Sequence, residues 1–226
     1  GDALTPELIV NFACAFGTWC GAGPVVIGRD TRRSSAAFRS AVTSGLLATG
    51  CRVIDLGITP SPLLSFTVRE LGARGGIAIT GSHNDASWNA LKFFGPDGAQ
   101  LNVARNGELL DVYHGAAYDL ATCGRLLPVE AAPGVEERYL DHLESALDVD
   151  PIRDRRFRVA VDFNNGACGP VASRFLERLR CTLLPVNAEP TGDFAHPPAP
   201  TAANMGQLAP LARGFHADLG AALNVD

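Results

Sequence analysis

Short apolar runs, each followed by a polar loop and a helical pattern, recur along the first third of the chain. The runs at 25–27, 51–56 and 77–79 have the length and composition of buried strands, and helical patterns separate them at 36–49 and 62–71. Two strand–helix–strand crossovers in succession produce a largely parallel sheet with helices on its faces. The sequence therefore predicts an α/β fold.

The same order of elements begins again later in the chain. A strand over 157–163 is followed by a glycine-containing loop, a helix over 170–179 and a strand over 181–186. This pattern predicts a second, related α/β domain of mixed, largely parallel sheet flanked by helices. The expected division is a first domain over 1–147, a charged, proline-containing linker over 148–156, and a second domain over 157–226 that is incomplete at its C-terminal end.

Composition narrows the class of protein. The 226 residues carry a net charge of −5 and are 46% hydrophobic, which is typical of a globular protein. The charges are mixed along the chain, so no basic stripe predicts nucleic-acid binding. No apolar segment has the length of a membrane span, and the N-terminus lacks the pattern of a signal peptide. We therefore expect a cytoplasmic protein without a membrane partner, whose ligands are small molecules.

The segment 75–92 contains the strongest candidate for a reactive group. The buried strand at 77–79 ends abruptly in small and polar residues around Ser82 and His83. Ligands of open α/β sheets bind beyond the carboxyl ends of the strands, where such a loop lies. We therefore expect Ser82 to carry a phosphoryl group.

Cationic side chains lie near this serine in the predicted fold. Arg29 and Arg32 follow the strand at 25–27 and precede a helix, and guanidinium groups and free amides in such a loop suit an anion. The spacing alone also fits arginines that are solvated or paired with an aspartate. Lys92 is the only lysine among 19 basic residues. A lysine exchanges protons readily when partly buried, whereas an arginine does not.

Together these segments resemble the phosphohexomutase family, whose members interconvert sugar 1- and 6-phosphates through a phosphoserine. The resemblance rests on segments that occur in family order: Thr80-Gly81-Ser82-His83-Asn84, Asn89-Ala90-Leu91-Lys92-Phe93, Gly28-Arg29-Asp30-Thr31-Arg32, Gly192-Asp193-Phe194 and Ala217-Asp218-Leu219-Gly220. The segment 93–98 is most similar to that of the phosphoglucosamine mutases. The chain is similar to the first two of the family's four domains. The resemblance thus implies that further C-terminal domains of the same polypeptide complete the enzyme, that this chain alone is inactive, and that a homodimer is possible.

The resemblance also implies roles for individual residues. Ser82 would be the phosphorylated, catalytic serine and Lys92 the general acid and base, while His83, Arg29 and Arg32 would bind substrate or phosphate. The family's Mg²⁺ would be held by the phosphate on Ser82 together with Asn224 and Asp226, since magnesium prefers hard oxygen ligands. The implied reaction is the conversion of glucosamine 6-phosphate to glucosamine 1-phosphate through a bisphosphate intermediate.

Three alternatives stay open from the sequence. The substrate could be that of a phosphomannomutase or a phosphoglucomutase. The chain could be a non-catalytic homologue that binds sugar phosphates, because Asn224 stands where the family has an aspartate, and Asp85, Gly81 and Ala90 replace a proline, an alanine and a glycine. A serine hydrolase that uses Ser82 and His83 is a third reading. It is disfavoured because neighbours in an extended loop point in different directions and no G-x-S-x-G elbow is present.

Overall fold

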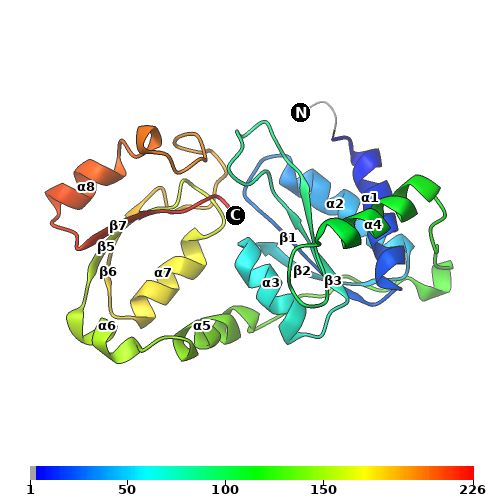
Figure 1. Cartoon of the computed structure of the whole chain (residues 1–226), viewed down its shortest axis with the longest axis horizontal. Helices are drawn as coiled ribbons and strands as arrows, with labels where there is room; N and C mark the ends of the chain where they lie inside the picture. Colours follow the sequence, from blue (N-terminus) through cyan, green and yellow to red (C-terminus); the bar gives the residue numbers. More distant parts are fainter. Residues whose placement is uncertain (1–3) are drawn as a thin grey trace. The chain divides into compact units, whose positions relative to one another are not determined.

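The computed structural model describes residues 4–226, which divide into two compact units (Figure 1). The first unit contains residues 4–29, 33–80 and 89–133. The second contains residues 134–226 together with two short segments from earlier in the chain, 30–32 and 81–88. The predicted serine loop therefore groups with the second unit, although the strand before it belongs to the first.

The first unit is built on a four-stranded sheet with the order β2-β1-β3-β4. Strand β1 (Pro24–Arg29) pairs in parallel with β2 (Arg52–Ile58) and β3 (Gly75–Ile79), and β4 (Leu91–Phe94) pairs with β3 in the antiparallel direction. Every residue of β3 is buried. The strand before the serine is thus an interior strand, as its apolar composition predicts.

Helices cover both faces of this sheet: α1 (Pro6–Cys20), α2 (Ser35–Ala48), α3 (Ser61–Glu70) and α4 (Val103–Gly115), with a short 3₁₀ turn, η1 (Cys123–Arg125). One core cluster joins Phe16 of α1 and Leu46 of α2 to Ile77 of β3, and Leu109 of α4 belongs to it. The other face packs against α3 through Leu64. Figure 1 shows α1, α2 and α4 on one side of β1–β3 and α3 on the other.

The second unit has a three-stranded parallel sheet with the order β6-β5-β7. Strand β5 (Arg158–Asp162) lies between β6 (Thr182–Val186) and β7 (Leu219–Ala222). This arrangement repeats the order β2-β1-β3 of the first sheet, since in both the first strand is central. The prediction of largely parallel α/β architecture is therefore confirmed. The helices of this unit are α5 (Val135–Ser145), α6 (Val149–Arg155), α7 (Gly169–Arg178) and α8 (Leu208–Gly214), with a 3₁₀ turn, η2 (Ala202–Asn204).

The segment 148–156, for which the sequence predicts a linker, contains helix α6. Its proline lies in the first helical turn, where a missing N–H costs no hydrogen bond. Arg178 of α7 pairs with Glu137 and Asp141 of α5, and Arg153 of α6 pairs with Glu144 of α5. These ion pairs hold α5 in the second unit, whereas the sequence predicts its helix within the first domain.

Among the helices of residues 4–226, none is both long enough and apolar enough to cross a membrane. The cytoplasmic location stays a prediction. The six cysteines are all free thiols, three of them buried and one, Cys123, exposed.

Candidate active site

The serine loop, residues 81–88, leaves β3 in a tight turn. Ser82 adopts a left-handed backbone conformation with φ of 51°, which is uncommon for a residue other than glycine. The amide of Asn84 donates to the carbonyl oxygen of Gly81 over 3.1 Å, and the Asn84 side chain donates to the same oxygen over 2.9 Å. Ser82 is half-buried, while residues 83–88 are exposed. Ser82 thus differs from residues 83–88 in its left-handed backbone and in its partial burial.

One buried side chain holds the backbone of the serine loop. The Nη2 atom of Arg32 donates to the carbonyl oxygens of Ser82 (2.7 Å) and Asn84 (2.8 Å). Its Nη1 atom donates to the carbonyl oxygens of Trp88 (2.9 Å) and Asp85. The Nε atom forms an ion pair with Asp30 at 2.8 Å, and both side chains are completely buried.

The hydrogen bonds described for Arg32 are all internal to the protein, whereas the family resemblance assigns this residue to substrate or phosphate binding. A guanidinium group carries five N–H donors, and all five are engaged by the loop carbonyls and Asp30. No donor is left for a phosphate ligand. Gly81 lies directly against this group, since a Cβ atom there would stand 2.6 Å from Arg32 Cζ. The glycine that departs from the family pattern thus permits this close approach.

The C-terminal end of β7 supplies the other side chains next to Ser82. Asn224 Nδ2 donates to Ser82 Oγ over 2.9 Å and to Asp226 Oδ1 over 2.8 Å. Val225, between them, is fully buried, and its carbonyl oxygen accepts from the amide of Ala167 over 2.8 Å. The fold thus brings together three residues that the sequence resemblance groups as metal ligands, although 142 positions separate Ser82 from Asn224.

The donor chemistry of these three residues suits a hard cation. A carboxylate and a hydroxyl offer oxygen atoms, which magnesium prefers. The Asn224 amide turns its nitrogen toward Ser82 and Asp226, and its Oδ1 accepts from the amide of Val225. A 180° rotation of the amide would present its oxygen instead. Within residues 4–226, no group of three or more His, Cys, Asp or Glu residues forms a metal site, so any cation here depends on the amide and on a phosphorylated serine.

Cys168 lies beside this site but lacks the character of a nucleophile. Its Sγ atom donates to the carbonyl oxygen of Asp226 over 3.7 Å. Burial, together with the negative charge of Asp226, raises the pKa of the Cys168 thiol to about 11. Because the thiolate is the reactive form, this cysteine stays protonated and inert near neutral pH.

The remaining predicted site residues are His83, on the serine loop, and Arg29 and Lys92, which belong to the first unit. His83 is exposed on the serine loop. Arg29 is the last residue of β1 and pairs with Ile79, whereas Lys92 on β4 pairs with Ala78. Neighbouring positions along a strand face opposite sides of a sheet, so Arg29 and Lys92 stand on opposite faces. Both belong to the first unit, and their association with Ser82 stays a prediction.

The sequence did not predict a polar cluster at the end of β5. Buried Asp162 accepts from Asn187 Nδ2 over 3.1 Å and pairs with His196 Nε2 at 3.1 Å. Asn164 is also buried. Its side-chain Nδ2 donates to the carbonyl oxygen of His196, and its Oδ1 accepts from the His196 backbone amide. The cluster fixes the loop after β5 and the segment that contains His196. An aspartate near the end of a predicted strand, followed by Phe-Asn-Asn-Gly, is the signal that could have found it.

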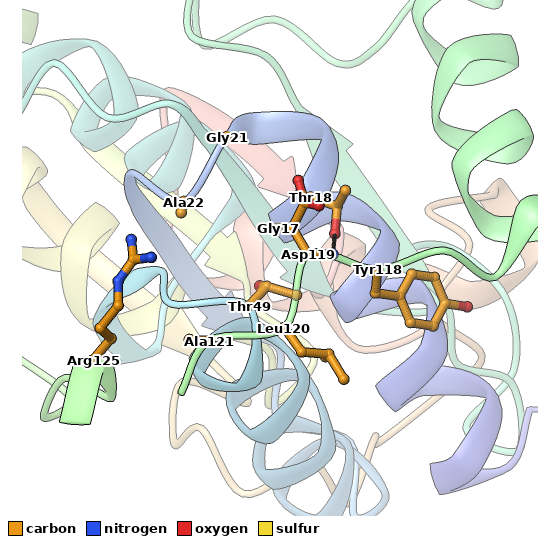
Figure 2. A pocket seen from close by; sticks show the side chains of 10 residues that line it. All are labelled: Gly17, Thr18, Gly21, Ala22, Thr49, Tyr118, Asp119, Leu120, Ala121 and Arg125. Carbon is orange, nitrogen blue, oxygen red and sulfur yellow. Dashed lines mark hydrogen bonds between the residues drawn. The ribbon is translucent and has the colours of Figure 1, made fainter. Parts of the chain in front are cut away.

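A separate hollow of the first unit lies between the C-terminal end of α1 and the segment after α4 (Figure 2). Thr18 and Asp119 line it, joined by a hydrogen bond of 3.1 Å from the Asp119 amide to Thr18 Oγ1, and Arg125 lies on the opposite rim. None of the predicted site residues lines this hollow, and its charged residues are exposed.

Comparison with known protein families gives two matches that together cover most of the chain. The family model described as phosphoglucomutase/phosphomannomutase, alpha/beta/alpha domain I, matches residues 1–117. The model for alpha/beta/alpha domain II of the same family matches residues 137–226. The second match begins close to the point where the second unit takes over from the first.

Individual relatives agree with these matches. A "probable phosphoglucosamine mutase" of Thermococcus kodakarensis is 35% identical over 226 residues, which are 100% of this chain and 49% of the relative. A phosphoglucomutase/phosphomannomutase of the same organism is 32% identical, with 100% and 50% covered. The crystal structure of a phosphoglucomutase/phosphomannomutase family protein from Burkholderia thailandensis matches with a TM-score of 0.84 and 25% identity, covering 97% of this chain and 49% of that one. The chain thus spans about half the length of the relatives it matches.

Proposed function

Because this chain belongs to the phosphoglucomutase/phosphomannomutase family, we propose that its protein is a phosphohexomutase that moves phosphate between the 6- and 1-positions of a hexose phosphate. One observation carries the proposal. Ser82 stands on a fixed left-handed turn with its Oγ atom in hydrogen-bond contact with Asn224, which also contacts Asp226. Phosphoryl transfer needs mainly positioning and charge stabilisation, and this arrangement supplies the positioning.

The proposed reaction starts from Ser82 in its phosphorylated form. A sugar hydroxyl oxygen bonds to the phosphorus atom as the bond from phosphorus to Ser82 Oγ breaks. The hydroxyl proton passes to a base and the serine oxygen takes up a proton, which leaves a sugar bisphosphate. Transfer of the other phosphoryl group back to Ser82 completes the cycle. Lys92 is the proposed acid and base, on the strength of the family resemblance, and His83 and Arg29 are proposed to contact phosphate groups.

We also propose Mg²⁺ as the cofactor. Asp226, the Asn224 amide oxygen and a phosphate oxygen on Ser82 are the groups that would hold it. When bound, the ion would neutralise negative charge on the transferring phosphoryl group. Asn224 is neutral, so this site would carry less negative charge than one built from two carboxylates.

The proposed substrate is glucosamine 6-phosphate, and mannose and glucose phosphates are the alternatives. The names of the relatives support both readings, since one is named for phosphoglucosamine and another for glucose and mannose phosphates. Parallel assays with the three 6-phosphates decide between them. The preferred reading requires kcat/KM for glucosamine 6-phosphate to exceed the other two.

The decisive experiment uses the complete protein in which this chain occurs. Intact-mass measurement is expected to show one phosphoryl group that disappears in Ser82→Ala, together with loss of hexose-phosphate turnover in the presence of Mg²⁺. Ser87→Ala, an exposed serine on the same loop, is the matched control and is expected to keep both. A protein that is never phosphorylated and turns over none of the three sugars would contradict the proposal.

A non-catalytic sugar-phosphate-binding protein is the second candidate, favoured by the neutral Asn224 beside the serine. Titration calorimetry separates the two. Binding of hexose phosphate without turnover by the complete protein would support the second candidate and exclude the first.

A further inference from the structure

We infer that Arg32 is the positioning residue of the phosphoserine loop: it fixes the path of the backbone that presents Ser82 and does not itself bind the transferred phosphate. The expected effect of Arg32 on catalysis rests on the proposed function. Its structural part concerns only the second unit and stands on hydrogen bonds between described residues.

The first argument is the geometry of the contacts. Arg32 donates to four carbonyl oxygens, the first at Ser82 and the last at Trp88, so one planar group spans nearly the whole loop. A surface loop can be ordered by side chains that pack into the core. The side chains of residues 83–88 are exposed, so they do not order this loop in that way. The guanidinium group therefore provides an interior anchor that these side chains do not.

The second argument is that Arg32 is itself held from several directions. Asp30 accepts from both the Arg32 side chain (2.8 Å) and its backbone amide (3.0 Å). The ring of Phe194 lies 5.2 Å from Arg32 Cζ, in cation–π contact. Thr31 Oγ1 donates to the carbonyl oxygen of Asn165 over 2.9 Å. Phe194 and the serine loop, both distant from Arg32 in sequence, thus contact its guanidinium group, and the Thr31 contact holds the adjacent backbone.

The third argument excludes the phosphate-binding role. All five donors of Arg32 are used, its side chain has no exposed surface, and its charge is balanced by the carboxylate of Asp30. A phosphate could be bound only by breaking contacts that hold the loop. A lysine would keep the charge but has a compact ammonium group with three donors, which does not reproduce the planar fork. Arg32→Lys therefore keeps the positive charge but removes the hydrogen-bond geometry that holds the loop carbonyls.

The structural test uses hydrogen exchange on the complete protein, read at amides of the serine loop, and needs no activity. The amides of Asn84 and Trp88, which donate to carbonyl oxygens within the loop, are the reporters. In Arg32→Lys we expect both to exchange at least about tenfold faster, because the loop opens without its anchor. Arg33→Gln, at the exposed neighbouring arginine, is the control and should leave both rates unchanged. Unchanged protection in Arg32→Lys would overturn the inference.

A milder variant covers the case in which Arg32→Lys fails to fold. Phe194→Leu removes the ring over the guanidinium group but none of the loop hydrogen bonds. It is expected to raise the two exchange rates about threefold. The effect is smaller because one cation–π contact is weaker than the four hydrogen bonds from Arg32 to the loop carbonyls. No change at either reporter amide in this variant would count against the inference.

The catalytic test uses the complete protein and separates positioning from binding. Misplacement of Ser82 should lower kcat of Arg32→Lys about a hundredfold, while KM for the hexose phosphate changes less than about threefold. A phosphate-binding arginine would instead raise KM, and that result would overturn the inference. If the wild-type protein has no mutase activity, the proposed function fails, whereas the exchange experiment still decides the role of Arg32.

Discussion

The serine loop at 81–88 and the loop at 163–168 both follow a parallel strand at the carboxyl edge of a sheet, yet they differ in how far their side chains are buried. In the serine loop the side chains from His83 onward are exposed, and one arginine holds the backbone. In the other loop Phe163 and Asn164 are fully buried, and backbone amides pair with neighbouring backbone, as Ala167 does with Val225.

This difference follows from what each loop has to do. A loop whose side chains meet a ligand cannot bury them, so its order has to come through its backbone. A loop that only supports a neighbouring segment can pack its side chains in the core. Functional loops are commonly carried by a rigid scaffold. In this chain the scaffold of the serine loop is a single guanidinium group rather than a layer of apolar side chains.

The largest effect in this comparison is expected from Asp30→Asn. It leaves the Arg32 charge buried without its carboxylate, and breaking a buried ion pair in this way costs about 3–5 kcal/mol of the free energy of unfolding. Urea denaturation of the chain measures the loss. Asp111→Asn, which removes the same charge from an exposed site on α4, should change stability by less than about 0.5 kcal/mol. Equal stability of the two variants would show that the fold does not depend on the ion pair between Asp30 and Arg32.

The second loop is tested by Gly166→Ala, with a smaller expected effect. A Cβ atom at this position would lie 2.5 Å from the Cα atom of Val225, which is backbone and cannot turn aside. Overpacking of this kind costs about 1–3 kcal/mol. Gly107→Ala on α4 is the matched control, since nothing lies within 4 Å of its added Cβ atom, and it should stabilise the helix by about 0.5–1 kcal/mol. Urea denaturation of both variants provides the comparison. A neutral Gly166→Ala would contradict tight backbone packing in this loop.

The smallest effect is expected from Asp85→Pro on the serine loop. The Asp85 carbonyl accepts from Arg32 and from the Trp88 amide, whereas the Asp85 amide donates none of the hydrogen bonds described for residues 4–226. Proline keeps the carbonyl and restricts the unfolded chain, so a gain of about 0.4–1 kcal/mol is expected in thermal unfolding. A loss greater than 1 kcal/mol would mean that the loop is held through its amides and not through its carbonyls.

Much of the architecture could be predicted because it depends on local patterns. Buried strands such as β3 and the helices around them follow from apolar periodicity and from Gly and Pro at their ends. Helix α6 was missed because Pro151 and its charges were read as a linker. Asp150 in its first turn and Arg153 and Arg155 in its last turn complement the helix dipole, and that signal was available.

The candidate site was only partly predictable for a physical reason. The sequence grouped Ser82 with Asn224 and Asp226, and the fold brings these three side chains together. It could not show that Arg32 is buried with every donor engaged. Four of the five acceptors are backbone carbonyl oxygens, which every residue possesses, so they leave no trace in residue identity.

The placement of Lys92 on β4 has a practical consequence. Every other basic side chain apart from histidine is an arginine, and guanidinium groups do not react as amines do. Within residues 1–226, Lys92 is therefore the one side chain that amine-directed reagents can modify. Isotopic methylation would place a single internal spectroscopic label on the antiparallel strand next to β3, and its signal would report directly on the protonation of the one lysine proposed to exchange protons with substrate.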